Sequence, residues 1–373
     1  MIKLLSLFSG IGAFEKALER IGELFETVNY CEIDKYAAKA YSLIHNTEES
    51  KNLKDVTKIN TDLLPDDLDL ITYGFPCQDI SLAGKQKGFK NEDGSFTRSG
   101  LFFEALRIIE ATKPNFAIAE NVKALTDKTF ETEFQIVLDS LEDAGYKNYY
   151  AVLNAKDYGI PQNRERVFII SIRKDIDNGF CFPKSFELKH RLKDLLEDKV
   201  DDKYYLSEKV QKRFRLTDYS LQNPIIETPN RLFNIYGYDG GSYAGNVYDQ
   251  EGLSPALLTM QGGNKQPMIV DYPKIRKLIP KECFRLMGFD DKDCDILEEN
   301  KISDSQIYKM AGNSIVVDVL EYLFKALFMQ YGDQLQIEAE IEPIVLEPMI
   351  LDFRQITFDD LLDNADSGLL EDD

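Results

Sequence analysis

The chain has 373 residues, enough for one large domain and a smaller one. Its residues are 43% hydrophobic and 29% charged, which is typical of a soluble globular protein. No apolar run is long enough to span a bilayer, and the five cysteines lack any Cys-x-x-Cys pair. We therefore expect a cytoplasmic protein with no membrane segment, disulfide framework or metal site. The net charge of −21 argues against a nucleic-acid partner, unless the binding face is a basic patch on an acidic background.

Short apolar runs alternate with helical patterns through the first half of the chain. Strands are predicted at 3–8, 25–32, 68–75, 115–121 and 167–173, and helices at 14–21, 35–44, 101–112 and 130–145. Strands that are apolar throughout are typical of a sheet covered by helices on both faces. The pattern predicts an α/β fold with a doubly wound, mostly parallel sheet over residues 1–185.

The periodicity weakens after residue 185. Residues 186–273 are rich in Gly, Tyr, Asn and Gln, which favours short strands and loops and predicts a second, smaller domain. Residues 274–305 would form a hinge. A C-terminal helical segment, 306–332, with one long helix that begins near Ser314, would return to complete the first domain.

The tail, residues 333–373, is strongly acidic. It holds 13 acidic residues and one basic residue, so it carries −12 of the net charge and leaves −9 on the body. Acidic runs are usually solvated, which is the expectation here. The interspersed Ile, Leu and Phe residues leave open a short docked element or an unknown partner.

A glycine-containing turn follows the first predicted strand. It consists of Phe8, Ser9, Gly10, Ile11 and Gly12. Glycines at such a turn let a ligand approach the backbone, and the N-terminus of the next helix presents free N–H groups. Glu32, at the end of the second strand, suits hydrogen bonds to ribose hydroxyls. A tight turn beside a solvated acid is the alternative, but the two features together favour a nucleoside-containing cofactor.

Cys77 follows the apolar strand at 68–75, within the segment Gly-Phe-Pro-Cys-Gln. A cysteine past the carboxyl end of a parallel strand lies on the ligand-binding edge of the sheet, whereas most free cysteines are buried and structural. The next twenty residues are rich in Gly and Lys. They predict a mobile active-site loop with basic residues for a phosphate backbone, with an ordinary surface loop as the alternative.

Two further strand ends carry charged side chains. Glu120 ends the strand at 115–121, where burial can keep a carboxyl protonated as an acid; a helix cap or surface ion pair is the alternative. Arg164 and Arg166 share one face of an extended chain, which suits a phosphate or a planar base edge; an edge-strand pairing with Glu165 is the alternative. His45 and His190, the only histidines, lie in no recognisable motif, so acid–base chemistry falls to carboxylates or water.

These motifs closely resemble, in order and spacing, those of the bacterial and phage cytosine-5 DNA methyltransferases. The resemblance extends over almost all of residues 4–331. It rests on the segments 7–12, 74–78, 120–122, 162–166, 276–289 and 312–314. The combination of Pro-Cys-Gln, Glu-Asn-Val and Gln-x-Arg-x-Arg is highly specific.

The resemblance implies S-adenosyl-L-methionine as the methyl donor, released as S-adenosyl-L-homocysteine. It places Phe8 near the adenine and Glu32 on the ribose. The implied cofactor residues are Phe8, Ser9, Gly10, Ile11, Gly12, Glu32, Ile33, Asp55, Val56, Phe75, Pro76, Asn313 and Ser314. Ile33 departs from the pattern, because several family members carry there an aromatic residue that stacks on the adenine.

The resemblance also implies the chemistry. The Cys77 thiolate would attack carbon 6 of a cytosine flipped out of the duplex, so that carbon 5 can take the methyl group. Glu120 would protonate or hydrogen-bond N3, and Arg166, with Arg164 nearby, would hold the carbonyl oxygen. The second domain of a monomeric enzyme would read a short site from the major groove. Contacts to double-stranded DNA would come from Gln78, Ser81, Lys85, Gln86, Lys87 and Arg98.

Two other functions stay open. A transfer RNA cytosine-5 methyltransferase shares the scaffold, but such proteins typically carry a Cys-Phe-Thr element, whereas Cys283 and Phe284 are followed here by Arg285. A non-catalytic acidic regulator or DNA mimic would fit the charge, but the intact set of Cys77, Glu120 and the two arginines argues against it. We expect an enzyme of DNA methylation, of the kind found in restriction-modification systems.

Overall fold

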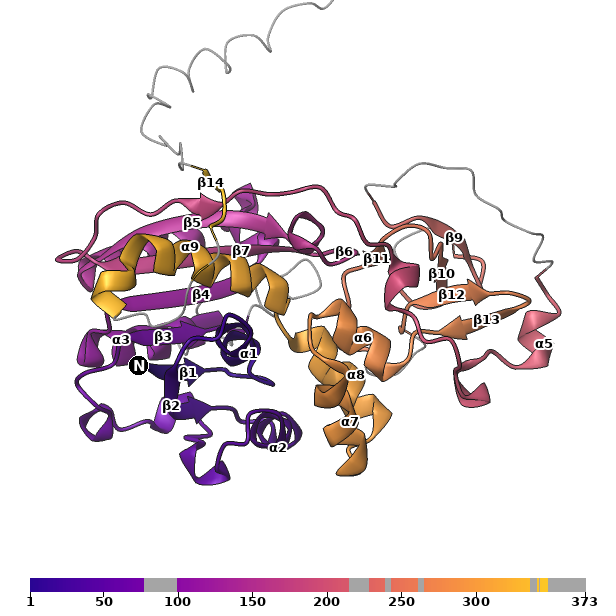
Figure 1. Ribbon diagram of the computed structural model, residues 1–373, viewed down its shortest axis with the longest axis horizontal. Helices are drawn as coiled ribbons and strands as arrows, with labels where there is room; N and C mark the ends of the chain where they lie inside the picture. Colours follow the sequence, from indigo (N-terminus) through magenta and orange to yellow (C-terminus); the bar gives the residue numbers. More distant parts are fainter. Residues whose placement is uncertain are drawn as a thin grey trace, which may run out of the picture.

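A computed structural model describes residues 1–76, 99–214, 228–238, 243–260, 265–335, 341 and 343–347. The chain forms a large α/β domain with a smaller lobe beside it (Figure 1). Within the ranges just given, no helix is long and apolar enough to cross a membrane.

A six-stranded sheet in the order β2-β1-β3-β4-β7-β5 forms the centre of the large domain. The strands β1 (Ile2–Leu7), β2 (Phe25–Cys31), β3 (Leu70–Tyr73) and β4 (Phe116–Val122) are parallel. β7 (Glu165–Arg173) runs antiparallel to both β4 and β5 (Tyr146–Asn154). The predicted mostly parallel sheet is confirmed. The sequence analysis did not predict β5, an edge strand that is mainly half-buried.

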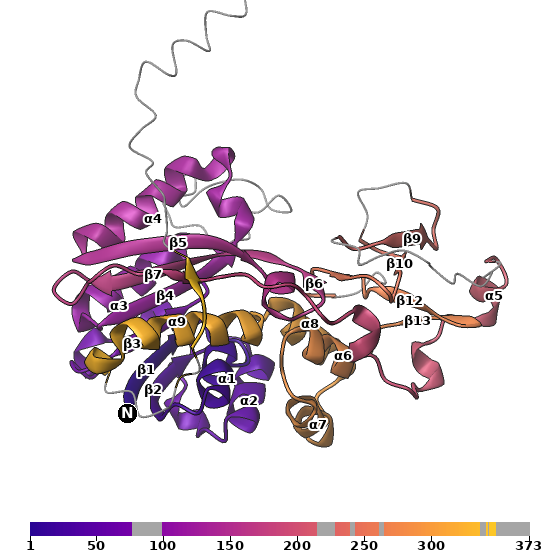
Figure 2. The same cartoon turned by 45° about the horizontal axis from the view of Figure 1, so that its top comes forward.

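Helices cover both faces of the sheet, as predicted (Figure 2). One face packs against α1 (Ala13–Arg20), α2 (Lys35–Ile44) and α9 (Val317–Leu335), and the other against α3 (Phe102–Thr112) and α4 (Glu131–Asp143). The apolar side chains of each helix group form a separate core with their face of the sheet. On the first face, the rings of Phe14 and Phe324 meet edge to face, with centroids 6.3 Å apart.

Two helices occupy the segment predicted as helical over 306–332, and the longer one begins close to the predicted Ser314. α8 (Asp304–Asn313) ends where the chain becomes extended at Ser314, and α9 begins at Val317. The Arg164 guanidinium donates to the carbonyl oxygens of Gly312 and Ser314 at this break. Carbonyls bound in this way need no partner from a continuing helix, so the break is stable.

A short part of the acidic tail docks on the large domain. β14 (Leu346–Glu347) pairs antiparallel with β8 (Phe182–Pro183), and Ile341, Ile344 and Leu346 pack against the core under α9. The apolar residues of the tail thus make the docked element that the sequence left open.

The smaller lobe contains a four-stranded sheet in the order β13-β12-β10-β9. Its strands are β9 (Arg231–Asn234), β10 (Asn246–Tyr248), β12 (Met268–Asp271) and β13 (Lys274–Lys277), with the short helix α5 (Glu208–Gln211) nearby. A second pair, β6 (Gln162–Asn163) and β11 (Ser254–Pro255), links the lobe to the large domain. The small sheet therefore extends past residue 273, into the predicted hinge.

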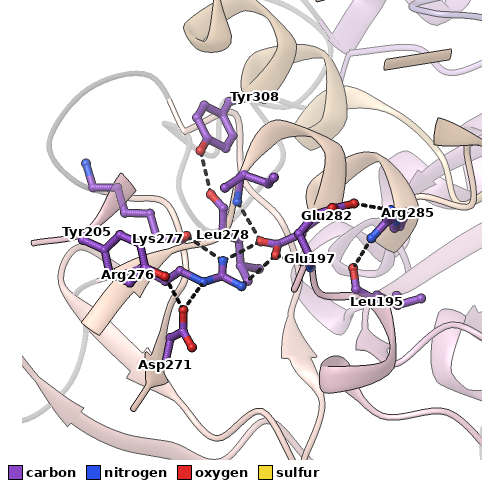
Figure 3. Close-up of polar contacts among 11 residues, drawn as sticks. Leu195, Glu197, Tyr205, Asp271, Arg276, Lys277, Leu278, Glu282, Arg285 and Tyr308 are labelled. Carbon is purple, nitrogen blue, oxygen red and sulfur yellow. Dashed lines mark hydrogen bonds and ion pairs between the residues drawn. The ribbon is translucent and has the colours of Figure 1, made fainter. Parts of the chain in front are cut away.

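A buried ion pair ties together the two stretches of chain that connect the lobes (Figure 3). Arg276 of β13 donates to both carboxylate oxygens of Glu282 in α6 (Pro280–Leu286), at 2.9 and 2.8 Å, and the two side chains are 2% and 0% exposed. Glu282 also accepts from the backbone N–H of Glu197, at 3.0 Å, on the other connecting stretch. Separating such a pair would leave buried charge unpaired, so the pair stabilises this junction between the lobes. The next helix in the chain is α7 (Asp291–Glu299).

Candidate active site

A cavity of about 500 Å³ lies at the carboxyl ends of β1 to β4 and is bounded by the start of β7 and the end of α8. Ten predicted cofactor residues line it: Phe8, Gly10, Ile11, Glu32, Ile33, Asp55, Val56, Phe75, Pro76 and Asn313. Three predicted catalytic residues line it as well: Glu120, Arg164 and Arg166. Parallel strands end at the same edge of a sheet, which is why segments so far apart in the chain converge here.

The turn after β1 has a left-handed backbone at Phe8, Gly10 and Gly12, with φ of 52°, 57° and 78°. The Gly10 N–H donates to Oε2 of Glu32 at 2.9 Å, so the turn is fastened to the end of β2. Gly12 caps α1, and a Cβ placed there would lie 2.1 Å from Nε2 of His45. Only glycine fits this position, for both its backbone and its space.

Glu32 and Ile33 form the wall at the end of β2. The Glu32 carboxyl accepts from the N–H groups of Gly10 and Asp34, and burial raises its pKa while these donors oppose the rise. A carboxylate has about four acceptor positions, so beyond these bonds the group can also bind a hydroxyl donor. Ile33 is apolar and lines the cavity, yet this residue is 75% exposed. A flat apolar ligand could therefore bury this apolar surface.

Three other predicted cofactor residues support the wall through their own bonds. Ser9 Oγ accepts from the Cys31 N–H at 3.1 Å, and the carbonyl of Ser9 accepts from the Gly12 N–H at 2.9 Å. The carbonyl of Ser314 accepts from Arg164 at 2.7 Å. These contacts fix the backbone on which the lining residues sit.

Glu120 and Arg166 pair at the other end of the cavity. Val122 and Arg166 are register partners across β4 and β7, and this antiparallel pairing sets Nε of Arg166 3.0 Å from Oε1 of Glu120. The side chains are only 12% and 20% exposed. Burial raises the pKa of Glu120, although the charges of Arg166 and Arg164 oppose the rise. A carboxyl in this state can either donate or accept a hydrogen bond.

Arg164 makes different contacts from Arg166. Its side chain is buried, Nη1 donates to the carbonyl of Leu257 at 2.9 Å, and Nη2 donates to the carbonyls of Gly312 and Ser314. Leu257 follows β11 in the chain. Arg164 thus ties two other segments, around residue 257 and residues 312–314, to the start of β7, and its geometry suits a positioning role.

Sequence reasoning missed two features of this site. Lys309 of α8 pairs with Asp34 across the cavity, and His45 touches the glycine turn from behind. Asp34 carries a usable signal, since an aspartate before a helix is a common N-cap, and it does accept from the Tyr36 and Ala37 N–H groups. Lys309 carries no such signal, because its partner Asp34 lies 275 residues away in the sequence.

The predicted nucleophile and the predicted DNA contacts lie outside the described residues. These are Cys77, Gln78, Ser81, Lys85, Gln86, Lys87 and Arg98. The described chain stops before them at Pro76, which lines the cavity. The backbone carbonyl of Phe75 is held by the Asn121 amide at 3.1 Å, so the segment leading to Cys77 is fastened to the end of β4.

Known proteins are similar to this chain in sequence and in fold. Residues 2–329 match the family of C-5 cytosine-specific DNA methylases. The type II methyltransferase M2.ScrFI of Lactococcus lactis subsp. cremoris is 40% identical over 279 residues, covering 75% of this chain and 71% of its own. The type II methyltransferase M.HhaI of Haemophilus parahaemolyticus is 36% identical over 328 residues, covering 86% and 93%.

A phage protein and a solved structure extend the comparison. The orphan methyltransferase M.SPBetaI of Bacillus phage SPbeta is 33% identical and covers 88% of this chain and 98% of its own. A DNMT2 variant from Spodoptera frugiperda has the same fold, with a TM-score of 0.66 at 20% identity, covering 88% of this chain and 100% of that chain. The chain therefore belongs to the C-5 cytosine-specific DNA methylase family and is a DNA (cytosine-5-)-methyltransferase.

Proposed function

We propose that this enzyme transfers a methyl group from S-adenosyl-L-methionine to carbon 5 of a cytosine flipped out of double-stranded DNA, with Cys77 as a covalent nucleophile. The observation that carries the proposal is the convergence of two sites on one cavity. The Glu32–Gly10 turn lies at one end, and the Glu120–Arg166 pair lies at the other.

The first end fits the methyl donor. The Glu32 carboxylate keeps acceptor positions for the ribose hydroxyls, and the apolar side chains of Phe8 and Ile33 suit an adenine ring. A cavity of about 500 Å³ lies within the range of small-ligand sites. When bound, the donor supplies an electrophilic methyl group on a sulfonium centre.

The second end fits a cytosine ring. Glu120, whose pKa is raised by burial, would donate a proton or a hydrogen bond to N3. The Arg166 guanidinium, held by Glu120, would bind the carbonyl oxygen and orient the ring. These contacts withdraw electrons from the ring and make carbon 6 electrophilic. A base inside a duplex cannot reach them, so the cytosine must be flipped out.

Cys77 would then carry the covalent step. Its thiolate would form a bond to carbon 6 as Glu120 gives a proton to N3. The electron pair this places on carbon 5 would bond to the methyl group as the methyl–sulfur bond of the donor breaks and S-adenosyl-L-homocysteine leaves. Water would next remove the proton from carbon 5, the bond between carbon 6 and sulfur would break to return the thiolate, and N3 would return its proton to Glu120. The smaller lobe and the predicted DNA-contacting side chains between Gln78 and Arg98 would hold the duplex.

Bisulfite sequencing of DNA from cells that express the enzyme tests the activity and identifies the methylated site. Cys77→Ser should lose turnover by at least about 10³-fold, as expected for a nucleophile, while still binding S-adenosyl-L-homocysteine. A variant that methylates at near the normal rate would contradict the nucleophile assignment.

A parallel assay on duplex DNA and on transfer RNA distinguishes the proposed substrate from the alternative one. In α6, Cys283 and Phe284 are followed by Arg285 and not by a threonine, which supports DNA as the substrate. Methylation of transfer RNA alone would overturn it.

A further inference from the structure

His45 sits directly behind the glycine turn, although no part of the proposed chemistry uses it. It caps the C-terminal end of α2, and its side chain is 4% exposed. Nε2 lies 3.0 Å from the carbonyl oxygen of Ile11, and Nδ1 lies 2.8 Å from Oε1 of Glu19. Both ring nitrogens therefore face oxygen atoms.

These two contacts determine how many protons the ring carries. A carbonyl oxygen can only accept, so Nε2 must hold a proton. A carboxylate likewise only accepts, so the close contact of Nδ1 with Glu19 requires one more proton between them. Imidazole is more basic than a carboxylate, which places that proton on the ring. The geometry therefore points to an imidazolium.

The surroundings of the ring agree with this state. Burial by itself disfavours the charged ring, but the Glu19 hydrogen bond and the charges of Glu15 and Glu19 outweigh it, so the pKa of His45 is raised above 6.5. The titratable groups that face the ring are Glu15 and Glu19 from α1 and Tyr41 from α2, whose ring centroid is 4.8 Å away. The C-terminal end of a helix also favours a cation.

We propose that protonated His45 is a positioning residue of the methyl-donor site. It holds the Ile11 carbonyl from behind, while Glu32 holds the Gly10 N–H from the cavity side, and together they set the shape of the turn. This rests on the proposed donor site. When His45 loses its proton, its bond to Glu19 or to Ile11 is lost, and the turn loosens.

The sign of the pH dependence follows from the raised pKa. The contribution of His45 to the turn is complete below the ordinary pKa of 6.5 and is lost as the pH rises through the raised value. Binding of the donor should therefore weaken toward alkaline pH. A His45→Gln variant keeps an N–H for the Ile11 carbonyl but cannot carry the charge, so its binding should be weaker and should lack this titration.

The first experiment observes the ring directly, in the full chain without ligand. The sequence contains only His45 and His190, so a nitrogen-15 histidine spectrum has two ring systems, and His190→Gln assigns them. We expect both nitrogens of His45 to remain protonated above pH 6.5. A neutral ring at that pH would overturn the proposal.

The second experiment measures the Kd for S-adenosyl-L-homocysteine against pH in the wild type, His45→Gln and His190→Gln. His190, with a side chain 63% exposed, is the matched control and should behave as wild type. For His45→Gln we expect a Kd raised roughly tenfold, an effect of about 1.4 kcal/mol, with KM for the donor affected more than kcat. Wild-type affinity and pH profile in this variant would overturn the positioning role alone. A wild-type enzyme that binds no S-adenosyl-L-homocysteine at any pH would overturn the proposed function with it.

Discussion

The two ends of the cavity use charged side chains in different ways. At the turn end, Glu32 and His45 bind backbone N–H and carbonyl groups and so give the chain its shape. At the other end, Glu120 and Arg166 pair with each other at the cavity wall and remain able to meet a ligand. The comparison indicates that substitutions at the first end should change affinity, while those at the second should change the rate of reaction.

The largest effect should come from Glu120→Gln. Glutamine matches the shape of the acid but cannot supply a proton, so kcat should fall by about 10²–10⁴-fold, with little change in the Kd for S-adenosyl-L-homocysteine. Single-turnover methylation and calorimetry measure the two quantities. The matched control is Glu165→Gln, since Glu165 is exposed, adjoins Arg166 and pairs with Lys123 at 3.0 Å. If both variants lost activity equally, the special role of Glu120 would be refuted.

The next effect separates the two arginines. Arg164→Met should lower the free energy of unfolding by about 3 kcal/mol, because three buried carbonyl groups lose a charged donor. Arg166→Met should destabilise less, since Glu120 can then take up a proton, but it should lose turnover. Urea denaturation and methylation assays on both variants test this contrast. The contrast fails if Arg164→Met is as stable as the wild type.

The positions of these side chains could be predicted only in part from the sequence. Apolar runs identified β3 and β4, and glycine and acid signals identified the turn and Glu32. The pattern Arg164-x-Arg166 predicted that the two arginines share one face. It could not predict that Arg164 binds the carbonyls of Leu257 and Gly312, because these partners lie 93 and 148 residues away and leave no local signal. The long C-terminal helix was predicted to begin near Ser314, as it does, but the separate helix α8 before it was not predicted.

A smaller effect is expected at the turn end from Gly12→Ala. The new Cβ would lie 2.1 Å from Nε2 of His45, at a φ of +78°. Gly22→Ala is the matched control, because φ is +76° there and nothing lies within 4 Å. The control should lose only about 1 kcal/mol of stability, the cost of a left-handed alanine. Gly12→Ala should lose more and should also bind S-adenosyl-L-homocysteine roughly tenfold more weakly. Equal effects in thermal unfolding and binding would show that the His45 contact is unimportant.

The smallest effect, and the only gain, should come from Ile33→Trp. Ile33 is exposed and lines the cavity next to Glu32, where a stacked ring would add about 0.5–1.5 kcal/mol to adenine binding. The chain contains no tryptophan, so the new indole is its own reporter. Its fluorescence should change when S-adenosyl-L-homocysteine binds, whereas the indole of Leu63→Trp, at an exposed position that does not line the cavity, should not respond. Unchanged fluorescence and affinity in Ile33→Trp would place the adenine elsewhere, and the turn end would no longer be the donor site.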